Sequence, residues 1–99
     1  MPFNNKNNKI TIKGFLSSDI QSDKTNIYAI TFTVKVARPA DSGGRVFYDE
    51  FSVYCSDRQN VNNCKANLTK GMSVKICGEL RVWNDGTYRI CVSTVQPIW

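Results

Sequence analysis

Apolar and polar side chains alternate through the middle of the chain. In the stretch ITFTVKV, every second residue from Ile30 to Val36 is apolar, and the residues between them are threonine or lysine. Successive side chains of a β-strand point to opposite faces of a sheet, so this pattern predicts a strand from about Ile27 to Ala37 with one core-facing side. The strand should end at RPADSGG, which contains a proline and two glycines.

Four further segments carry a β pattern. KITIKGFL, residues 9–16, alternates isoleucine with threonine and lysine, and Gly14 suggests a bulge or a bend. VFYDEFSVYCS, residues 46–56, is rich in aromatic and β-branched residues. MSVKICGELRVW (residues 72–83) and TYRICVSTV (residues 87–95) are joined by Asn-Asp-Gly, a strong hairpin signal because asparagine and glycine tolerate positive φ. The chain therefore contains five strand-like segments.

The hydrophobic period changes between residues 56 and 71. The sequence SDRQNVNNCKANLTKG offers Ser56 or Asp57 as an N-cap and ends in a glycine, so a short helix fits it best. The apolar residues at helical spacing are Val61, Cys64 and Leu68.

Three strands, a helix and a two-stranded hairpin form the element order of the OB-fold, a five-stranded Greek-key β-barrel. We therefore expect an all-β protein with one short helix, although small α+β domains and other barrels can produce the same order. The chain has 99 residues, which is enough for one core. We expect an Asn-rich, disordered segment over residues 1–8 and a single OB-fold domain over residues 9–99.

Charge and composition favour an anionic partner. Thirteen lysines and arginines against eight aspartates and glutamates give a net charge of +5, and 11% of the residues are aromatic. Charge alone is equally compatible with a solvated basic surface and with nucleic-acid binding. No apolar run reaches the roughly 20 residues of a membrane helix, and the first residues lack a secretory segment. We therefore expect a cytoplasmic protein without a membrane partner.

The residue types of the sequence argue against a metal site and against a catalytic site. The sequence has no histidine and no CxxC pair, so we expect neither a metal nor another cofactor. Acid–base catalysis usually needs a histidine or paired carboxylates, but Asp49 and Glu50 are adjacent on a strand and face opposite sides. We expect a binding protein rather than an enzyme. An even number of cysteines is compatible with disulfides, but wide spacing favours reduced structural thiols at Cys55, Cys64, Cys77 and Cys91.

Four blocks of the sequence resemble bacterial-type single-stranded DNA-binding proteins. NKITIKGFLSSDI is similar to that family's Asn-Lys-Val, Gly-x-Leu and Asp pattern, and FTVKVAR to its Phe-Thr-Leu-Ala-Val-x-Arg. DEFSVYC resembles its Thr-Asp-Phe or Thr-Glu-Trp strand, and LTKGMSVKICGELR its Leu-x-Lys-Gly-x-x-Val-x-Val-x-Gly-x-Leu segment. The blocks stand in the family's order and cover about Asn8 to Val95. The opening pattern is filled by Asn8, Lys9, Ile10, Gly14, Leu16 and Asp19.

The resemblance implies binding of single-stranded DNA with little sequence specificity, in DNA replication, recombination or repair. Such a protein needs cations along the phosphates and flat side chains on which unpaired bases stack. An OB barrel offers this platform on its second and third strands, framed by two loops. Family members usually form tetramers, so a homo-oligomer, dimer or tetramer, is expected. The alternative is an OB-fold protein-interaction or RNA-binding module, such as a primosome component.

Candidate contacts lie on the two platform strands and the final hairpin. Thr33 and Lys35 should point outward, and the resemblance makes Phe51 the stacking aromatic, with Phe47 on the same face by alternation. A register slip of one residue would place Phe51 in the core instead, and Trp83 could pack at a subunit interface. The complete set of predicted nucleic-acid contacts is Lys9, Lys13, Thr33, Lys35, Arg38, Arg45, Phe47, Phe51, Arg81, Trp83, Tyr88 and Arg89.

The sequence departs from the family in one loop and at its C-terminus. RPADSGGR stands where family members commonly have a long hairpin with a stacking aromatic, and no acidic tip follows QPIW. Family members usually recruit other replication proteins through that tip. We therefore expect this chain to coat DNA without recruiting such partners through its C-terminus.

Overall fold

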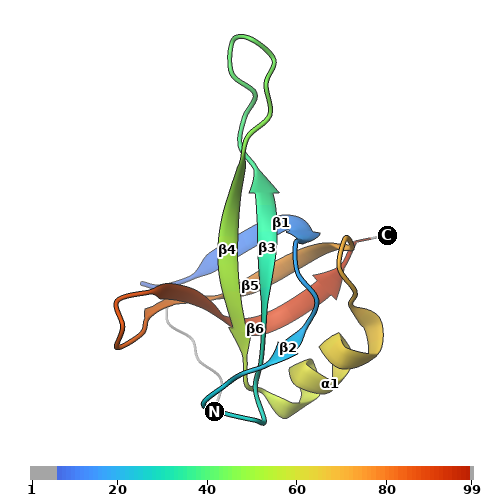
Figure 1. Ribbon diagram of the computed structural model, residues 1–99, viewed down its shortest axis with the longest axis vertical. Helices are drawn as coiled ribbons and strands as arrows, with labels where there is room; N and C mark the ends of the chain where they lie inside the picture. The colour runs from blue at the N-terminus through green and yellow to red at the C-terminus, as the bar shows by residue number, and fades with distance from the viewer. Residues whose placement is uncertain (1–6, 99) are drawn as a thin grey trace.

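The structure, a computed structural model, describes residues 7–98. Within that range it is built of β-strands and one short helix, as predicted (Figure 1). The elements in chain order are β1 (Ile10–Leu16), β2 (Gln21–Ser22), β3 (Ile30–Ala37), β4 (Tyr48–Cys55), α1 (Arg58–Asn67), β5 (Ser73–Val82) and β6 (Tyr88–Pro97).

Five of the strands close into a barrel. β1 pairs with β5, β5 with β6, β6 with β4, and β4 with β3, and a short pairing between β3 and β1 completes the ring. These pairings are antiparallel except for that of β4 with β6. This is the Greek-key arrangement of the OB-fold, so the predicted architecture is confirmed. The two-residue β2, which the sequence pattern did not predict, extends the sheet beyond β3.

Alternating side chains of the strands fill the barrel. On β3, Ile30, Phe32 and Val34 are buried, and Phe32 lies opposite the buried Val53 of β4. The predicted core face of this strand is therefore confirmed. The buried residues that form the core cluster are Ile12, Leu16, Ile30, Phe32, Val34, Val53, Cys55, Val61, Cys64, Leu68, Val74, Ile76 and Ile90.

Two glycines allow the strands to approach closely at the seams of the barrel. A Cβ atom at Gly14 would collide with the carbonyl oxygen of Lys35, because β1 changes here from pairing with β5 to pairing with β3. Gly14 therefore marks a close approach without a break in register. The bulge lies instead on β6, where Ser93 is the extra residue between Thr94 and Val92, the partners of Cys77 and Gly78.

The helix α1 is capped as its sequence suggests. The carboxylate of Asp57 accepts a hydrogen bond from the backbone N–H of Asn60 at 3.1 Å, which satisfies one of the free donors of the first turn. Val61 and Cys64 are its buried residues, so one side of the helix packs on the barrel. Of the two predicted N-caps, Asp57 is the one used.

Two hairpins extend beyond the barrel in different directions (Figure 1). Residues 38–47, here called the β3–β4 arm, connect β3 to β4, and residues 83–87 join β5 to β6. Inside the arm, Asp41 accepts hydrogen bonds from the backbone N–H groups of Gly43 and Arg45, both at 2.9 Å. The arm is thus an organised turn.

Some predicted boundaries differ from the structure. β3 begins at Ile30, because Ile27 and Tyr28 lie in an exposed loop, and β4 begins at Tyr48 because the preceding residues belong to the arm. Residues 1–6 of the segment expected to be disordered lie outside the described residues. Asn8, near its end, exchanges two hydrogen bonds with the backbone of Leu80.

The four cysteines are free thiols. Cys55 and Cys64 are buried, and Cys77 and Cys91 are half-buried. The hydrogen-bonded contact with Cys64 and burial both raise the pKa of the Cys55 thiol. Across residues 7–98, no group of three or more potential metal ligands comes together, and no helix is long and apolar enough to cross a membrane.

Candidate nucleic-acid interface

The outer face of β3 and β4 is a polar surface at the front of the barrel. Thr33 lies opposite Ser52, and Lys35 lies opposite Glu50, on the side away from the buried Phe32. Thr33 and Lys35 therefore point outward as predicted, because they alternate with core residues.

Ser17 and Ser18, which follow β1, form hydrogen bonds with residues at the edge of this surface. The Ser17 hydroxyl donates to Glu50 at 2.9 Å and lies 2.6 Å from the Thr33 hydroxyl. The Ser18 hydroxyl accepts from the backbone N–H of Thr33 at 3.0 Å. The polar groups near Thr33 are thus fixed in position before any ligand arrives.

Phe51 is not on this outer face. It shares its side of β4 with Val53 and Cys55, which are fully buried, and its half-buried ring packs against the core cluster. Alternation places residues 51, 53 and 55 on one side of β4, as expected, but the prediction that this side faces outward is wrong because it is the side that packs on the core. Phe47 follows the same alternation but lies in the β3–β4 arm, where its ring is exposed and the Arg45 guanidinium lies 5.8 Å from its centroid.

An aromatic and cationic group occupies the outer face instead; we call Tyr54, Trp83, Arg89 and Asp23 the Trp83 cluster. The rings of Tyr54 and Trp83 meet edge to face with centroids 5.2 Å apart. The Arg89 guanidinium lies 4.7 Å from the centroid of the Trp83 indole, within the range of a cation–π interaction. The cluster joins β4, the end of β5 and the start of β6.

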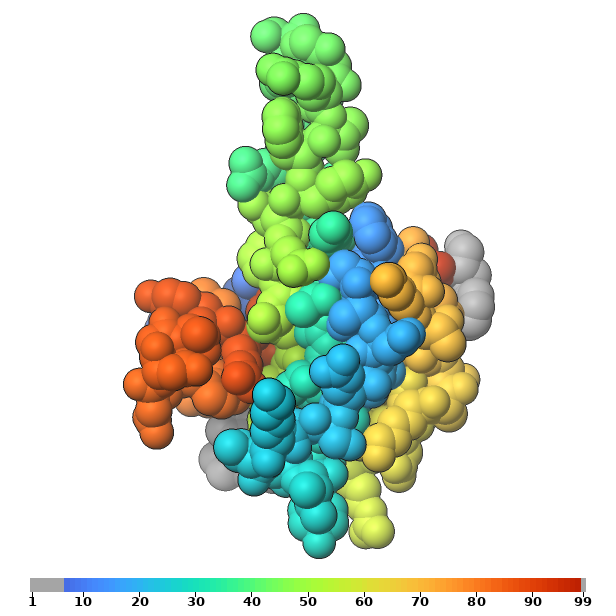
Figure 2. All heavy atoms as spheres, in the orientation of Figure 1, coloured from blue at the N-terminus to red at the C-terminus, as the bar shows by residue number. Residues whose placement is uncertain are grey.

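The loop between β2 and β3 completes the Trp83 cluster. Arg89 forms an ion pair with Asp23 at 3.4 Å, and the Asn26 side-chain amide donates to the Tyr54 hydroxyl at 3.2 Å. In Figure 2 the hairpin of residues 83–87 (orange) and the loop of residues 23–28 (cyan) border β4 (green). These are the two loops that frame the ligand face of an OB-fold.

Asp23 is held firmly as an anion. Its carboxylate accepts from the Thr25 hydroxyl at 2.7 Å and from the backbone N–H groups of Thr25 and Asn26. The Thr25 hydroxyl is the main cause that lowers the pKa of Asp23, followed by the two backbone donors and Arg89, while burial opposes them. Asp23 therefore anchors Arg89 over the indole.

Sequence reasoning missed Tyr54 and Asp23. Alternation does place Tyr54 on the side opposite Val53, which would have identified it once Val53 was known to be buried. No local signal links Asp23 to Arg89, because 66 positions separate them. Only the closure of the barrel brings these two residues together.

The remaining predicted contacts are spread over the molecule. Tyr88 is exposed and pairs with Val82, on the opposite face of the final hairpin from Arg89. Lys9 directly precedes β1 and is exposed, and Lys13 of β1 faces away from the core, directly opposite Lys75 of β5. They do not belong to the Trp83 cluster.

Each predicted arginine has a carboxylate partner. Arg38 meets Asp49 at 2.6 Å, and this hydrogen-bonded contact lowers the pKa of Asp49. The other ion pairs are Arg45 with Asp41, Arg81 with Glu79, and Arg89 with Asp23. A phosphate that approaches any of these arginines competes with an anion already in place.

A second aromatic pair lies beside the outer face of β3 and β4. Phe15 of β1 and Tyr48 of β4 meet edge to face with centroids 5.6 Å apart. Phe15 lies opposite Lys35 of β3, so the pair reaches across the outer surface of β3. Aromatic side chains therefore stand at two places on the outer surface.

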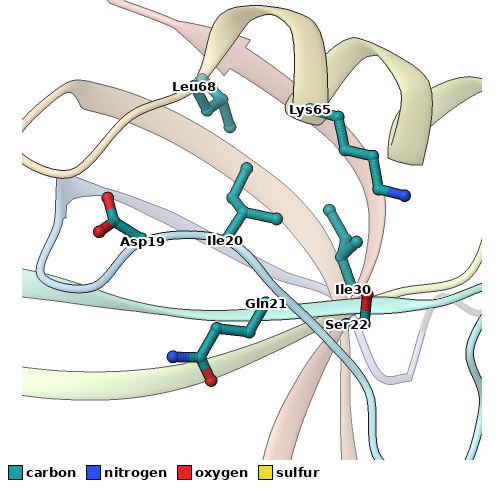
Figure 3. Close-up of a pocket in the computed structure, with 7 residues that line it drawn as sticks. All are labelled: Asp19, Ile20, Gln21, Ser22, Ile30, Lys65 and Leu68. Atoms are coloured by element: carbon teal, nitrogen blue, oxygen red, sulfur yellow. The ribbon is translucent and has the colours of Figure 1, made fainter.

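A hollow of about 280 Å³ lies between α1 and the chain around β2 (Figure 3). Ile20, Ile30 and Leu68 form its aliphatic floor, and Lys65 and Asp19 stand at its rim. It is on the helix side of the molecule, and the Trp83 cluster contributes no residue to it. The lining of this hollow contains no aromatic residue on which a base could stack.

Comparison with known proteins supports the fold. No protein-family profile and no curated protein matches the sequence. Among solved structures, a small single-stranded DNA-binding protein from Streptomyces coelicolor is 17% identical with a TM-score of 0.72, over 91% of each chain. The Plasmodium falciparum SSB in complex with ssDNA is 21% identical with a TM-score of 0.73, over 98% of this chain and 99% of the other.

A domain of a PriB protein has the same fold. The dimeric N-terminal domain of PriB from Thermoanaerobacter tencongensis is 18% identical with a TM-score of 0.64, over 94% of this chain and 98% of the other. At these identities the likeness establishes a shared OB-fold, which leaves the ligand to be argued from the side chains.

Proposed function

We propose that the protein binds single-stranded DNA with little sequence specificity and protects it during replication, recombination or repair. The observation that carries this proposal is the Trp83 cluster, which places two aromatic rings and a guanidinium on the ligand face of an OB barrel. Stacking is tolerant of sequence because every base has a flat π-face.

The geometry suggests how a strand would be held. Bases stack on the accessible ring faces of the half-buried Trp83 and Tyr54, while the hydroxyls of Thr33 and Ser52 line the floor between the two strands. Arg89 donates to a phosphate as its ion pair with Asp23 is exchanged. This arrangement contacts faces and phosphates, so it favours an unpaired strand over a duplex.

The sequence blocks and the shared fold support the same proposal. The blocks resemble single-stranded DNA-binding proteins, and one structure of the same fold is described as an SSB complex with ssDNA. A homo-oligomer is part of the proposal, since the PriB domain of this fold is described as dimeric.

We infer that the protein works by binding rather than catalysis, in the cytoplasm. The groups gathered on the ligand face are aromatic and cationic, which suits stacking and phosphate contact. Four free thiols are typical of proteins in a reducing compartment.

A titration with labelled single-stranded DNA, duplex DNA and single-stranded RNA of equal length tests the proposal. We expect the single-stranded DNA to bind more tightly than the duplex, with similar affinity for different base sequences. Equal affinity for the duplex would contradict single-strand binding, and a clear preference for RNA would favour the RNA-binding alternative.

A further inference from the structure

The cations of this protein fall into two groups. The arginines at positions 38, 45, 81 and 89 each form an ion pair with a carboxylate. Within residues 7–98, by contrast, none of the lysines lies within 4.0 Å of a carboxylate oxygen. In the described chain, the lysines and Arg58 of α1 are therefore the cations that can meet a phosphate without losing a carboxylate partner.

Two of these lysines, Lys13 and Lys75, lie on the outer surface of β1 and β5, and Lys9 directly precedes β1; we call Lys9, Lys13 and Lys75 the lysine strip. Lys13 and Lys75 are directly opposite each other in the antiparallel pair. Side chains in such a position have Cβ atoms about 4.5–5.5 Å apart, and like charges there repel. An anion between them would relieve this repulsion.

Cys77 of β5 lies beside the lysine strip. Its thiol lies 3.4 Å from the hydroxyl of Thr11, directly across the pair from it. The contact with Thr11 is the main cause that lowers the pKa of Cys77, burial opposes it, and Thr94, then Lys75 and Lys9, lower the pKa by smaller amounts. The nearest carboxylate along β5, that of Glu79, is occupied by Arg81 at 2.6 Å.

The lysine strip is continuous with the proposed binding face. Phe15 follows Lys13 on the same side of β1 and lies opposite Lys35 of β3. Its ring contacts that of Tyr48 on β4. A path of aromatic and cationic side chains thus runs from β4 over β3 and β1 to β5.

We propose that a single strand leaving the platform turns across Phe15 onto the lysine strip, where Lys13 and Lys75 share its phosphates. This inference rests on the proposed function and extends it, because it assigns a second, purely electrostatic contact to the β1–β5 surface. The strand then follows the barrel sideways instead of continuing along the β3–β4 arm.

The test compares two DNA lengths and two double variants. Single-stranded oligonucleotides of about 5 and about 16 nucleotides span the range of site sizes known for OB-folds. The variant Lys13→Gln/Lys75→Gln removes the proposed contact. The control Lys65→Gln/Lys70→Gln removes the same charge from exposed positions at α1 and the turn after it. Titrations use excess DNA so that one protein meets each strand.

When the Lys13→Gln/Lys75→Gln variant binds the long oligonucleotide, two fewer phosphates should be neutralised than with the wild type, and fewer counterions should be released. The slope of log K against log salt should fall by about 1.4, which extrapolates to an affinity about 25-fold weaker at 0.1 M salt than that of the wild type. Short-oligonucleotide binding should be unchanged, and the control should match the wild type at both lengths. Removing the facing charges should also leave the melting temperature equal or higher.

Several results would overturn the inference. One is a Lys13/Lys75 variant that binds the long strand like the wild type or like the control. Equal losses at both lengths would place these lysines on the platform itself. If the variant had a different oligomer mass from the wild type in light scattering, the lysine strip would be a contact between subunits instead. If the wild type binds neither oligonucleotide, the proposed function itself fails, an outcome distinct from the others.

Discussion

Trp83 is the residue on which binding should depend most. Its half-buried indole contacts both the Tyr54 ring and the Arg89 guanidinium, so its orientation is fixed before a base arrives. We predict that Trp83→Ala weakens single-strand binding by about 1 to 3 kcal/mol, a factor of roughly 5 to 150, because stacking on the indole is lost. Fluorescence anisotropy with labelled DNA measures this loss.

Two comparison variants sharpen this result. Trp83→Phe keeps an aromatic face and should retain most of the affinity. Tyr88→Ala removes a ring from the opposite face of the same hairpin and should cost less than Trp83→Ala. If Tyr88→Ala weakened binding more than Trp83→Ala, the proposed ligand face would be wrong.

Phe51 should affect folding more than binding. Its ring is half-buried against the core cluster, so truncation to alanine leaves a gap beneath β4. We predict that Phe51→Ala lowers the free energy of unfolding towards the lower end of the about 3 to 5 kcal/mol found for phenylalanine truncation. Chemical denaturation measures it. A clear loss of affinity with unchanged stability would return Phe51 to the DNA face.

At the scale of the elements, one ion pair joins the loop between β2 and β3 to strand β6. Asp23 binds Arg89, and the Thr25 hydroxyl is the main cause that holds the pKa of Asp23 below its ordinary value. A carboxylate whose pKa is lowered in the folded state contributes stability above the pKa of the unfolded chain. That contribution is lost as the pH falls through the lower, folded pKa.

We therefore predict that Asp23→Asn makes stability less dependent on pH. Between about pH 5 and pH 2, the free energy of unfolding should fall less in this variant than in the wild type. The control Asp19→Asn removes a carboxylate from an exposed position without an ion pair in the described chain, and should behave like the wild type. Identical pH profiles for wild type and Asp23→Asn would show that Asp23 does not hold the loop.

The whole molecule should show the salt response of a cationic single-strand binder. Its net charge is +5, and the lysines of the described chain are free of carboxylate partners. For Z neutralised phosphates, log K should fall with log salt with a slope of about −0.7Z. Titrations at several salt concentrations measure this slope, and a flat response would show that the positive charge is not engaged.

The four thiols should have no part in binding. All are free, and the two buried ones, Cys55 and Cys64, belong to the core cluster. We predict that neither a reducing agent nor a metal chelator changes the affinity for single-stranded DNA. A loss of affinity with the chelator would point to a metal-dependent protein.

The order of the elements could be predicted from the sequence because it depends on local periodicity. Alternation along residues 30–36 follows from strand geometry, and the Asp57 cap depends on hydrogen bonds within one helical turn. The outward direction of Thr33 and Lys35 follows from the same alternation. These features need no knowledge of which strands become neighbours.

The ligand face was decided by the tertiary structure. Alternation shows that Phe51, Val53 and Cys55 share a side of β4, but burial of that side depends on closure of the barrel around the core cluster, to which β1, β5 and α1 also contribute. The meeting of Asp23 and Arg89 and the facing of Lys13 and Lys75 are likewise products of barrel closure. Local periodicity therefore determined which residues share a face, while long-range strand pairing determined which faces meet, because pairing joins positions far apart in the chain.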